Sequence, residues 1–286
     1  MWRSVSHIAL LLVVIILMLR LTGCMERMFY IPTVGPTPLA AAPRGTQEVW
    51  FNSTDSTRLY GWFIPSRLHA EGGPPAPTIL HVHGNAGNIQ SHTYFTEYLP
   101  HAGFNVFIFD YRGYGQSAGS AKRRNDLIAD THAALDAMLQ RSDVDVSRIG
   151  LYGQSLGGAI GVNLMAERPE IKAAVIESAF TSWREIAASV VGGDPPNFIG
   201  RWLAALVLPD HARPIDAIAR IERPMLLIHG DADSIIPVGH SRRLAAAAPD
   251  FAELLLLPGG DHNTLRDSHP EIDMQVVRFF RRHVRD

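Results

Sequence analysis

Short apolar runs alternate with longer segments of helical spacing along most of the chain. The apolar runs predict strands at residues 77–82, 104–109, 149–152, 173–176, 225–228 and 253–257. The segments of helical spacing predict helices at residues 91–101, 125–139, 156–166, 241–248 and 269–284. This alternation predicts an α/β fold, with a mostly parallel central sheet and helices on both of its faces. Ligand sites in such folds lie beyond the carboxyl ends of the strands.

Two further runs precede this series, at residues 48–51 and 58–64, and a turn-forming Asn-Ser-Thr-Asp sequence joins them. They predict two edge strands that form a hairpin. The stretch before them, residues 25–44, is rich in Pro and Ala and contains Gly-Pro as a breaker. We therefore expect a single domain at residues 47–286, preceded by a linker at residues 24–46.

The N-terminus has the pattern of a targeting segment. Arg3 precedes an uninterrupted apolar run of twelve residues at 8–19, which is short for a membrane-spanning helix of roughly 20 residues. Leu-Thr-Gly-Cys follows and resembles the bacterial lipobox, in which the cysteine is lipidated. We expect residues 1–23 to be a lipoprotein signal peptide and Cys24 to be the lipidation site. Arg20 departs from the usual pattern, so an uncleaved anchor helix stays open as the alternative.

Composition excludes several classes of function. The formal net charge is −2, with 47% hydrophobic and 19% charged residues, and no basic stretch is present that could follow a phosphate backbone. We therefore expect no nucleic-acid partner. Cys24 is the single cysteine, so the chain cannot form an intrachain disulfide.

Two segments match the Gly-x-Ser-x-Gly pattern of a nucleophile elbow, one around Ser117 and one around Ser155. An elbow needs a strand that runs directly into a tight turn and then a helix. Ser155 follows the predicted strand at 149–152 and precedes an apolar, glycine-rich helix, whereas Ser117 lies in a loop with no helix after it. The context therefore identifies Ser155 as the candidate nucleophile.

The loop after the strand at 77–82 has the sequence His-Gly-Asn-Ala-Gly-Asn. Acyl transfer needs two backbone N–H groups directed at the developing oxyanion, each contributing about 3 kcal/mol in the transition state. We expect these donors to be Leu156, the residue after the nucleophile, and Asn85 in this loop. His81 and His83 share one face of the strand. No third ligand stands at an obvious spacing, so we expect no metal site.

The base and the acid are expected downstream of the nucleophile, in the order Ser, acid, His. His262 is the histidine in the loop after the last predicted strand, and it follows an acidic loop that contains Asp231 and Asp233. Either aspartate could orient the imidazole. Asp261 is too close to His262 in sequence to do so.

With these residues assigned, residues 48–284 resemble the alpha/beta-hydrolase superfamily, and in particular a branch of membrane-tethered serine hydrolases. The motifs that carry the resemblance are HGNAGN at 83–88, DYRGYGQS at 110–117, GQSLG at 153–157, HGDADSIIP at 229–237 and GDHN at 260–263. The spacing of the acid to Ile-Ile-Pro in this family selects Asp233, and Asp231 is then expected to cap the turn. In the family the DYRGYG loop is structural, which argues against Ser117. Asp261 is an insertion relative to the usual Gly-His-Asn.

The resemblance implies a hydrolase with a Ser155–His262–Asp233 triad, an acyl-enzyme intermediate and no cofactor. A carboxylic ester or thioester is the expected substrate class, because an alcohol or thiol leaves more easily than an amine, and the substrate is expected to be a small molecule or a lipid-like acyl compound. The expected setting is the bacterial envelope, where the protein is tethered to a membrane, on the periplasmic side in a Gram-negative cell. A peptidase or amidase, an acyltransferase and a catalytically silent binding protein stay open. The stretch 178–223 predicts a small helical insertion before the acid strand, which either roofs the site and supplies an apolar acyl pocket or packs on the sheet.

Overall fold

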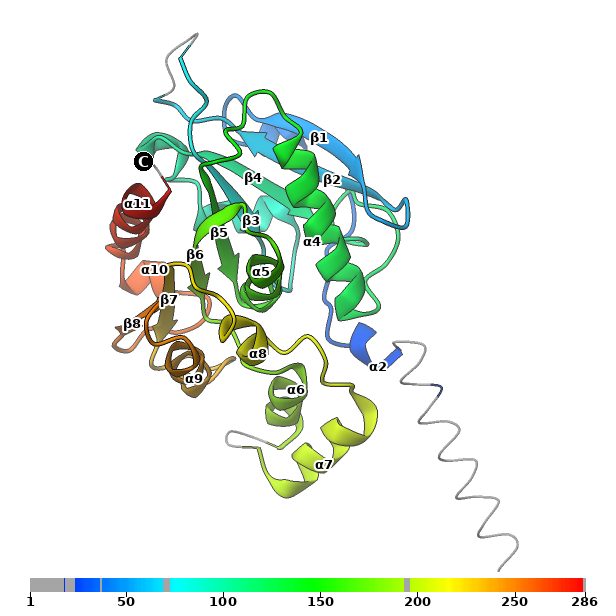
Figure 1. Cartoon of the computed structure of the whole chain (residues 1–286). Helices are drawn as coiled ribbons and strands as arrows, with labels where there is room; N and C mark the ends of the chain where they lie inside the picture. Colours follow the sequence, from blue (N-terminus) through cyan, green and yellow to red (C-terminus); the bar gives the residue numbers. More distant parts are fainter. Residues whose placement is uncertain (1–17, 19–23, 37, 69–72, 193–195, 285–286) are drawn as a thin grey trace, which may run out of the picture.

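The computed structural model of the chain describes residues 18, 24–36, 38–68, 73–192 and 196–284. Within this part, one sheet of eight strands has the order β1-β2-β4-β3-β5-β6-β7-β8 (Figure 1). The strands are β1 (Gln47–Asn52), β2 (Arg58–Ile64), β3 (Thr78–Val82), β4 (Asn105–Asp110), β5 (Ile149–Gln154), β6 (Ile171–Glu177), β7 (Met225–Gly230) and β8 (Ala252–Leu257). β1 and β2 form the predicted antiparallel hairpin, β2 pairs antiparallel with β4, and all later neighbours are parallel. The mostly parallel sheet is therefore as predicted.

Helices cover both faces of this sheet. They are α2 (Cys24–Arg27), α3 (Ile89–His92), α4 (Arg124–Leu139), α5 (Leu156–Glu167), α6 (Trp183–Gly192), α7 (Phe198–Val207), α8 (Pro214–Ile218), α9 (Gly239–Ala247), α10 (Leu265–Ser268) and α11 (Ile272–His283). Successive strand residues point to opposite faces. Leu80 and Leu151 therefore pack with α4, α5 and α8, whereas Ile79 and Tyr152 pack with α3 and α11.

Two predicted helices differ from the observed ones. The segment predicted as a helix at 91–101 contains only the end of α3, followed by short 3-10 turns at Thr93–Phe95 and Pro100–Ala102. Aromatic and β-branched residues at 93–96 are weak helix formers, and Pro100 cannot continue a helix. The segment predicted at 269–284 contains α11, which begins only after Pro270, and α10 precedes it.

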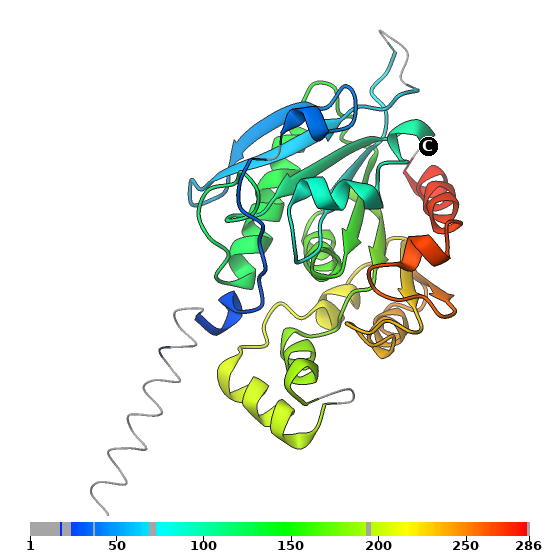
Figure 2. The ribbon, with the colours of Figure 1, turned by 180° about the vertical axis from the view of Figure 1, so that it is seen from behind.

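The helical insertion consists of α6, α7 and α8. α8 packs against α5, whereas α6 and α7 pack against each other through a small cluster of Ala187, Ala188, Ala204 and Leu208. Figures 1 and 2 show α6 and α7 at one end of the molecule, away from the β1–β2 hairpin. The sequence left open whether the insertion roofs the site or packs on the sheet. α6 and α7 do not simply pack on the sheet.

Part of the segment expected to be a linker packs on the domain. Residues Pro32 and Val34 form isolated parallel bridges to Gly87 and Gly115. Arg124 is fully buried, and its side chain donates to the Glu26 carboxylate at 2.9 and 3.2 Å. The same guanidinium donates to the carbonyls of Pro209 and His211, at 2.8 and 3.2 Å. One arginine thus ties the start of the domain to the segment that follows α7.

The predicted signal peptide lies outside the described residues except for Met18, and Cys24, the predicted lipidation site, is the first residue of α2. Among the described residues, none of the helices combines the length and the apolar character needed to cross a bilayer.

We predict that Glu26→Ala destabilises the protein by about 3 kcal/mol or more, because it leaves the buried Arg124 without its counter-charge. Urea unfolding of the full chain in detergent, followed by circular dichroism, measures the change. The double variant Glu26→Ala/Arg124→Met removes both charges and should be more stable than Glu26→Ala alone. A single variant as stable as the wild type would show that this ion pair does not hold the segment.

Candidate active site

Ser155 occupies the tight turn between β5 and α5. Its backbone is in the left-handed region, with φ 55° and ψ −116°, a conformation that costs energy for a residue with a side chain. The Ser155 N–H donates to the carbonyl of Glu177 at 2.8 Å. A Cβ on Gly157 would stand 1.9 Å from the carbonyl oxygen of Val82, and one on Gly153 would stand 2.7 Å from the Gly157 oxygen. Glycines on both sides of the serine therefore allow the turn.

His262 lies between Ser155 and Asp233. Its Nε2 is 3.1 Å from the Ser155 Oγ, and its Nδ1 is 2.7 Å from Oδ2 of Asp233. Because a carboxylate only accepts, Nδ1 carries the proton and Nε2 is left to accept from the serine hydroxyl. The three predicted side chains, far apart in sequence, thus form one chain of hydrogen bonds.

The carboxylate of Asp233 is fully enclosed. Its Oδ1 accepts from the N–H groups of Ile235 and Ile236, at 2.9 and 2.7 Å, and its Oδ2 lies 3.2 Å from Nε2 of His229. Burial opposes ionisation, but the hydrogen bonds from His229 and His262 outweigh it and hold the pKa of Asp233 well below its ordinary value. Asp233 therefore stays ionised beside the imidazole.

The two other aspartates of these loops do not contact the imidazole. Asp231 is exposed and accepts from the N–H of Gly259 at 2.6 Å, and Asp261 accepts from the N–H of Ser234 at 2.8 Å. Each carboxylate thus joins the loop after β7, which carries Asp233 and is called the acid loop below, to the loop after β8, which carries His262 and is called the histidine loop.

His229 is a positioning residue that the sequence reasoning did not assign. Its Nε2 faces two acceptors, the carboxylate of Asp233 and the carbonyl of Ile236 at 2.8 Å, so this nitrogen carries the proton. Its Nδ1 then accepts from the hydroxyl of Ser241 at 2.6 Å. His229 is the first residue of the HGDADSIIP motif, and this position was the sequence signal from which its role could have been inferred.

The loop that contains Asn85 is held from several sides. The Asn85 side chain donates to the carbonyl of Phe29 at 2.5 Å and accepts from the hydroxyl of Tyr114 at 3.0 Å. The hydroxyl of Tyr111 donates to the carbonyl of His83 at 2.8 Å. No hydrogen bond to another described residue is donated by the backbone N–H of Asn85 or Leu156. Both N–H groups are thus without a protein acceptor in this part of the chain.

Ser117 has a structural environment. Its hydroxyl is buried, accepts from the N–H of Tyr60 at 2.9 Å and donates to the carbonyl of Asp110 at 2.6 Å. The side chain of Asp110 in turn accepts from the N–H of Ile89 at 2.8 Å. Burial raises the pKa of Asp110 to about 7 although that N–H opposes the shift. Ser117 thus stabilises the DYRGYG loop by joining it to β2.

His81 and His83 are buried, and each has a protein partner. Nδ1 of His81 is 2.9 Å from the hydroxyl of Thr96, and Nδ1 of His83 is 2.7 Å from the carbonyl of Gly84. Across the described residues, no cluster of three or more His, Cys, Asp or Glu side chains is arranged to hold a metal ion. Burial lowers the pKa of both imidazoles, which favours their neutral forms.

A cavity of about 460 Å³ adjoins the serine and the histidine. Its lining is mostly apolar and comes from distant parts of the chain: Phe29, Tyr30, Ile31, Leu156, Phe180, Trp183, Ile186, Leu208, Ile235 and Ile236. Trp183 and Leu208 belong to the apolar stretch noted in the sequence. Phe29, Tyr30 and Ile31 come from the segment expected to be a linker, and no signal in their pattern indicated a place in the cavity.

A buried hydrogen-bond network of Arg266, Glu177 and Tyr152 fixes the segment that follows His262. Arg266, four residues after His262, donates to both carboxylate oxygens of Glu177 at 2.8 and 2.7 Å and to the hydroxyl of Tyr152 at 2.7 Å. Glu177 is the residue whose carbonyl accepts from Ser155. The same residue therefore fixes the serine turn through its backbone and the histidine loop through its side chain.

Comparison with known proteins gives the family. Residues 73–213 match the Hydrolase_4 family, described as serine aminopeptidase, S33. The uncharacterized protein YfhR of Escherichia coli O157:H7 is 38% identical over 259 residues, which cover 88% of this chain and 85% of YfhR. The alpha/beta hydrolase domain-containing protein WAV2 of Arabidopsis thaliana is 32% identical over 260 residues, which cover 85% of this chain and 82% of WAV2.

Solved structures of the same fold include hydrolases of two kinds. The Pyrococcus furiosus esterase Pf2001 superposes with a TM-score of 0.70 at 22% identity, covering 89% of this chain and 99% of the esterase. The Pyrococcus horikoshii acylaminoacyl peptidase superposes with a TM-score of 0.67 at 20% identity, covering 84% of this chain and 42% of the peptidase. The sheet order, the helical layers and these matches agree, and the chain belongs to the alpha/beta-hydrolase superfamily.

Proposed function

We propose that this protein is a serine hydrolase that cleaves carboxylic esters or thioesters with an apolar acyl group. One observation carries the proposal: the hydrogen-bonded series Ser155, His262 and Asp233 adjoins an apolar cavity. A nucleophile needs a base within hydrogen-bonding reach, and the base needs a third group to orient it. Both distances meet this requirement.

The reaction follows from these contacts in two steps. Nε2 of His262 takes the proton of the Ser155 hydroxyl while Oγ attacks the acyl carbonyl, and Asp233 stabilises the imidazolium that forms. The backbone N–H groups of Leu156 and Asn85 are proposed to bind the oxyanion. His262 then protonates the leaving alcohol or thiol, and a water molecule, activated by the same imidazole, releases the acid. No step calls for a cofactor.

The cavity favours an acyl chain over a peptide amine. An aminopeptidase must bind the positively charged amino group of its substrate. Of the described residues that line the cavity, Glu26 is the only acid, and its carboxylate is paired with Arg124. The remaining surface is dominated by aromatic and aliphatic side chains, which bind apolar groups. The esterase rather than the peptidase among the structural neighbours is therefore the better guide to substrate.

We also propose that the N-terminus attaches the enzyme to a membrane, by a lipid on Cys24 after removal of residues 1–23, and that the enzyme belongs to the membrane-tethered branch of its superfamily. The apolar run at 8–19 and the Leu-Thr-Gly-Cys sequence support this arrangement. It places the hydrolase in the bacterial envelope.

Ser155→Ala should lower turnover of p-nitrophenyl butyrate by roughly 10⁴-fold or more, because it removes the attacking oxygen. The rate of p-nitrophenol release measures this, and circular dichroism establishes that the variant is folded. Ser117→Ala is the matched control and should keep activity near that of the wild type when folded. Retained turnover in Ser155→Ala would contradict the proposed nucleophile.

Asp233→Asn should lower kcat by roughly 10⁴-fold, because an amide can donate to Nδ1 and so favour the wrong tautomer of His262. Asp231→Asn, two residues away and exposed, should change kcat only a few-fold. Steady-state kinetics with the same ester compares the two variants. Equal losses, or a larger loss in Asp231→Asn, would mean that the acid is misassigned.

Ile186→Trp should shift the preferred acyl length, because the larger side chain takes up space in the apolar cavity. A series of p-nitrophenyl esters from acetate to decanoate measures kcat/KM at each length. We expect the value for acetate to stay within a few-fold of the wild type, while the values for long chains fall by roughly tenfold or more. A uniform change at all lengths would show that the acyl chain does not occupy this cavity.

A further inference from the structure

Helix α7 carries a face of large apolar side chains that no other part of the described protein covers. The exposed fractions are 80% for Phe198, 63% for Ile199, 55% for Trp202 and 36% for Leu203. Their spacing along the helix puts them on one side. Ala204, by contrast, is buried against α6. Phe198, Ile199, Trp202 and Leu203 are referred to below as the α7 face.

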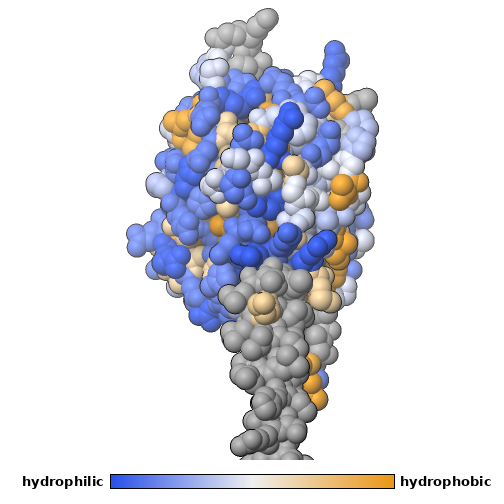
Figure 3. Space-filling model, turned by 90° about the vertical axis from the view of Figure 1, so that its right-hand side faces the viewer, coloured by the Kyte–Doolittle hydropathy of each residue, from blue (hydrophilic) through white to orange (hydrophobic). Residues whose placement is uncertain are grey.

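Such a concentration of exposed aromatic and aliphatic groups is unusual on a soluble surface and marks an interaction site. Figure 3 shows one side of the molecule, whose described surface is mostly hydrophilic with hydrophobic residues in small groups. The residues of the α7 face are not among those that line the cavity at Ser155. Their exposure is therefore not explained by substrate binding in that cavity.

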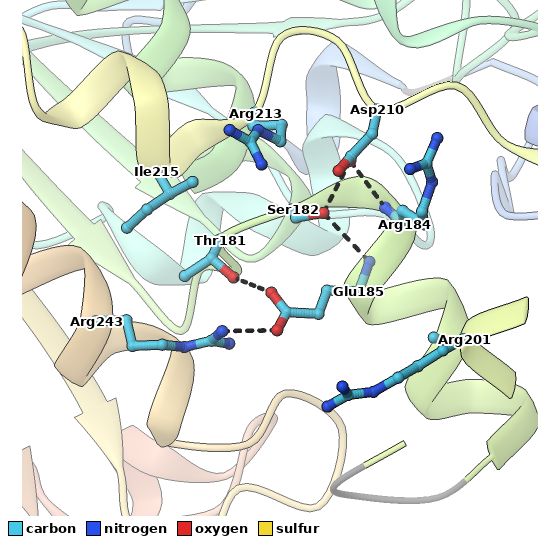
Figure 4. Close-up of a pocket in the computed structure, with 10 residues that line it drawn as sticks. Thr181, Ser182, Arg184, Glu185, Arg201, Asp210, Arg213, Ile215 and Arg243 are labelled. Atoms are coloured by element: carbon cyan, nitrogen blue, oxygen red, sulfur yellow. Dashed lines mark hydrogen bonds and ion pairs between the residues drawn. The ribbon is translucent and has the colours of Figure 1, made fainter. Parts of the chain in front are cut away.

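Positive charge lies next to the α7 face. A second cavity, of about 400 Å³, is lined by Arg184, Arg201, Arg213 and Arg243 together with the acids Glu185 and Asp210 (Figure 4). Arg243 pairs with Glu185, and Arg213 pairs with Asp216.

The side chains of the other two arginines contact carbonyl groups, although Asp210 lines the same cavity and its carboxylate accepts from the backbone N–H of Arg184 at 3.3 Å. Arg184 and Arg201 donate to the carbonyls of Leu208 and Pro196, and neither forms an ion pair with another described residue. Arg201 belongs to α7 itself and is exposed. An apolar helix face flanked by guanidinium groups is the pattern of a helix that lies in the interface of an anionic membrane.

The position of the α7 face agrees with the position of the N-terminal attachment. Arg124 joins Glu26 of α2 to Pro209 and His211, just after α7. Phe29 packs on the cluster between α6 and α7. In Figures 1 and 2, α2 and α7 lie at the same end of the molecule. α2 begins at Cys24, so a bilayer that held the proposed lipid on Cys24 would be adjacent to the α7 face.

We propose that the α7 face docks on an anionic phospholipid bilayer, with Phe198, Ile199 and Trp202 inserted at the boundary of headgroups and acyl chains. Arg201 and Arg184 then meet the lipid phosphates. Phe29 packs on the buried side of α7, where Ala204 lies, and also lines the cavity at Ser155, so this cavity adjoins the helix that carries the docking site. The acyl substrate is therefore drawn from the bilayer, a conclusion that rests on the proposed hydrolase function, whereas docking itself does not.

Fluorescence quenching tests docking without any assay of hydrolysis. The full chain is reconstituted in vesicles of phosphatidylcholine and phosphatidylglycerol whose acyl chains carry bromine, which quenches tryptophan inside the bilayer. We expect bromine to quench roughly half or more of the Trp202 emission, so the quenched amplitude should fall in Trp202→Phe. The matched control is Trp50→Phe, which removes a half-exposed tryptophan on β1 and should leave the quenched amplitude unchanged. Any contribution from Trp2 is common to all three proteins.

Two results would overturn the proposal. One is an equal quenched amplitude in the wild type and in Trp202→Phe. The other is absence of Trp202 quenching together with a dimer in detergent, which would assign the α7 face to a second copy of the chain. Equal quenching in vesicles of pure phosphatidylcholine would remove the requirement for anionic lipid.

A second variant separates docking from catalysis. Phe198→Ser/Ile199→Ser/Trp202→Ser should reduce hydrolysis of a long-chain fluorogenic ester dissolved in the vesicles by roughly tenfold. Its turnover of soluble p-nitrophenyl butyrate should match the wild type. If the wild type shows Trp202 quenching but the triple variant loses activity on both the long-chain ester and p-nitrophenyl butyrate, the result would count against the link between docking and substrate supply. Loss of neither activity would do the same.

Discussion

The turn at Ser155 is the constraint on which the site depends. A residue with a side chain is held at positive φ there, and the strain is sustained because the surroundings leave the backbone no alternative. Gly157 passes so close to the carbonyl of Val82 that no Cβ fits, and the Ser155 N–H is fixed by Glu177. This close packing of β3, β5 and α5 presents the hydroxyl at the carboxyl end of the sheet, with the N-terminus of α5 beside it.

Everything else at the site converges on that hydroxyl. The loops after β7 and β8 lie side by side because these strands are parallel neighbours, and Asp231 and Asp261 join the loops by hydrogen bonds to backbone N–H groups. His262 and Asp233 meet as a result. Four hydrogen-bond donors surround the Asp233 carboxylate, which offsets the cost of burying its charge. The arrangement is preorganised, since hydrogen bonds among protein groups hold each of its members in place.

Local sequence signals predicted most of the sheet and indicated Ser155 and His262, whereas Asp233 was selected over Asp231 only by the family resemblance. The strands were apparent because each apolar run is short and bounded by Gly, Pro or a polar turn, and Ser155 because strand, turn and helix follow one another directly. The prediction of a helix at 91–101 was wrong. The helical spacing of apolar residues continues to residue 101, but α3 ends at His92 and only short 3-10 turns follow. His229 was not assigned although its motif offered a signal, whereas Phe29 and Arg266 were not assigned because their roles depend on contacts between distant segments. No local pattern announces such contacts.

The central claim is that Ser155 is an activated nucleophile. A fluorophosphonate probe reacts covalently with such a serine, and mass spectrometry of the digested protein locates the adduct. The account predicts a single adduct at Ser155 that requires an intact His262, so that His262→Ala is not labelled under the same conditions. An unlabelled wild-type protein, or an adduct at Ser117 instead, would contradict it.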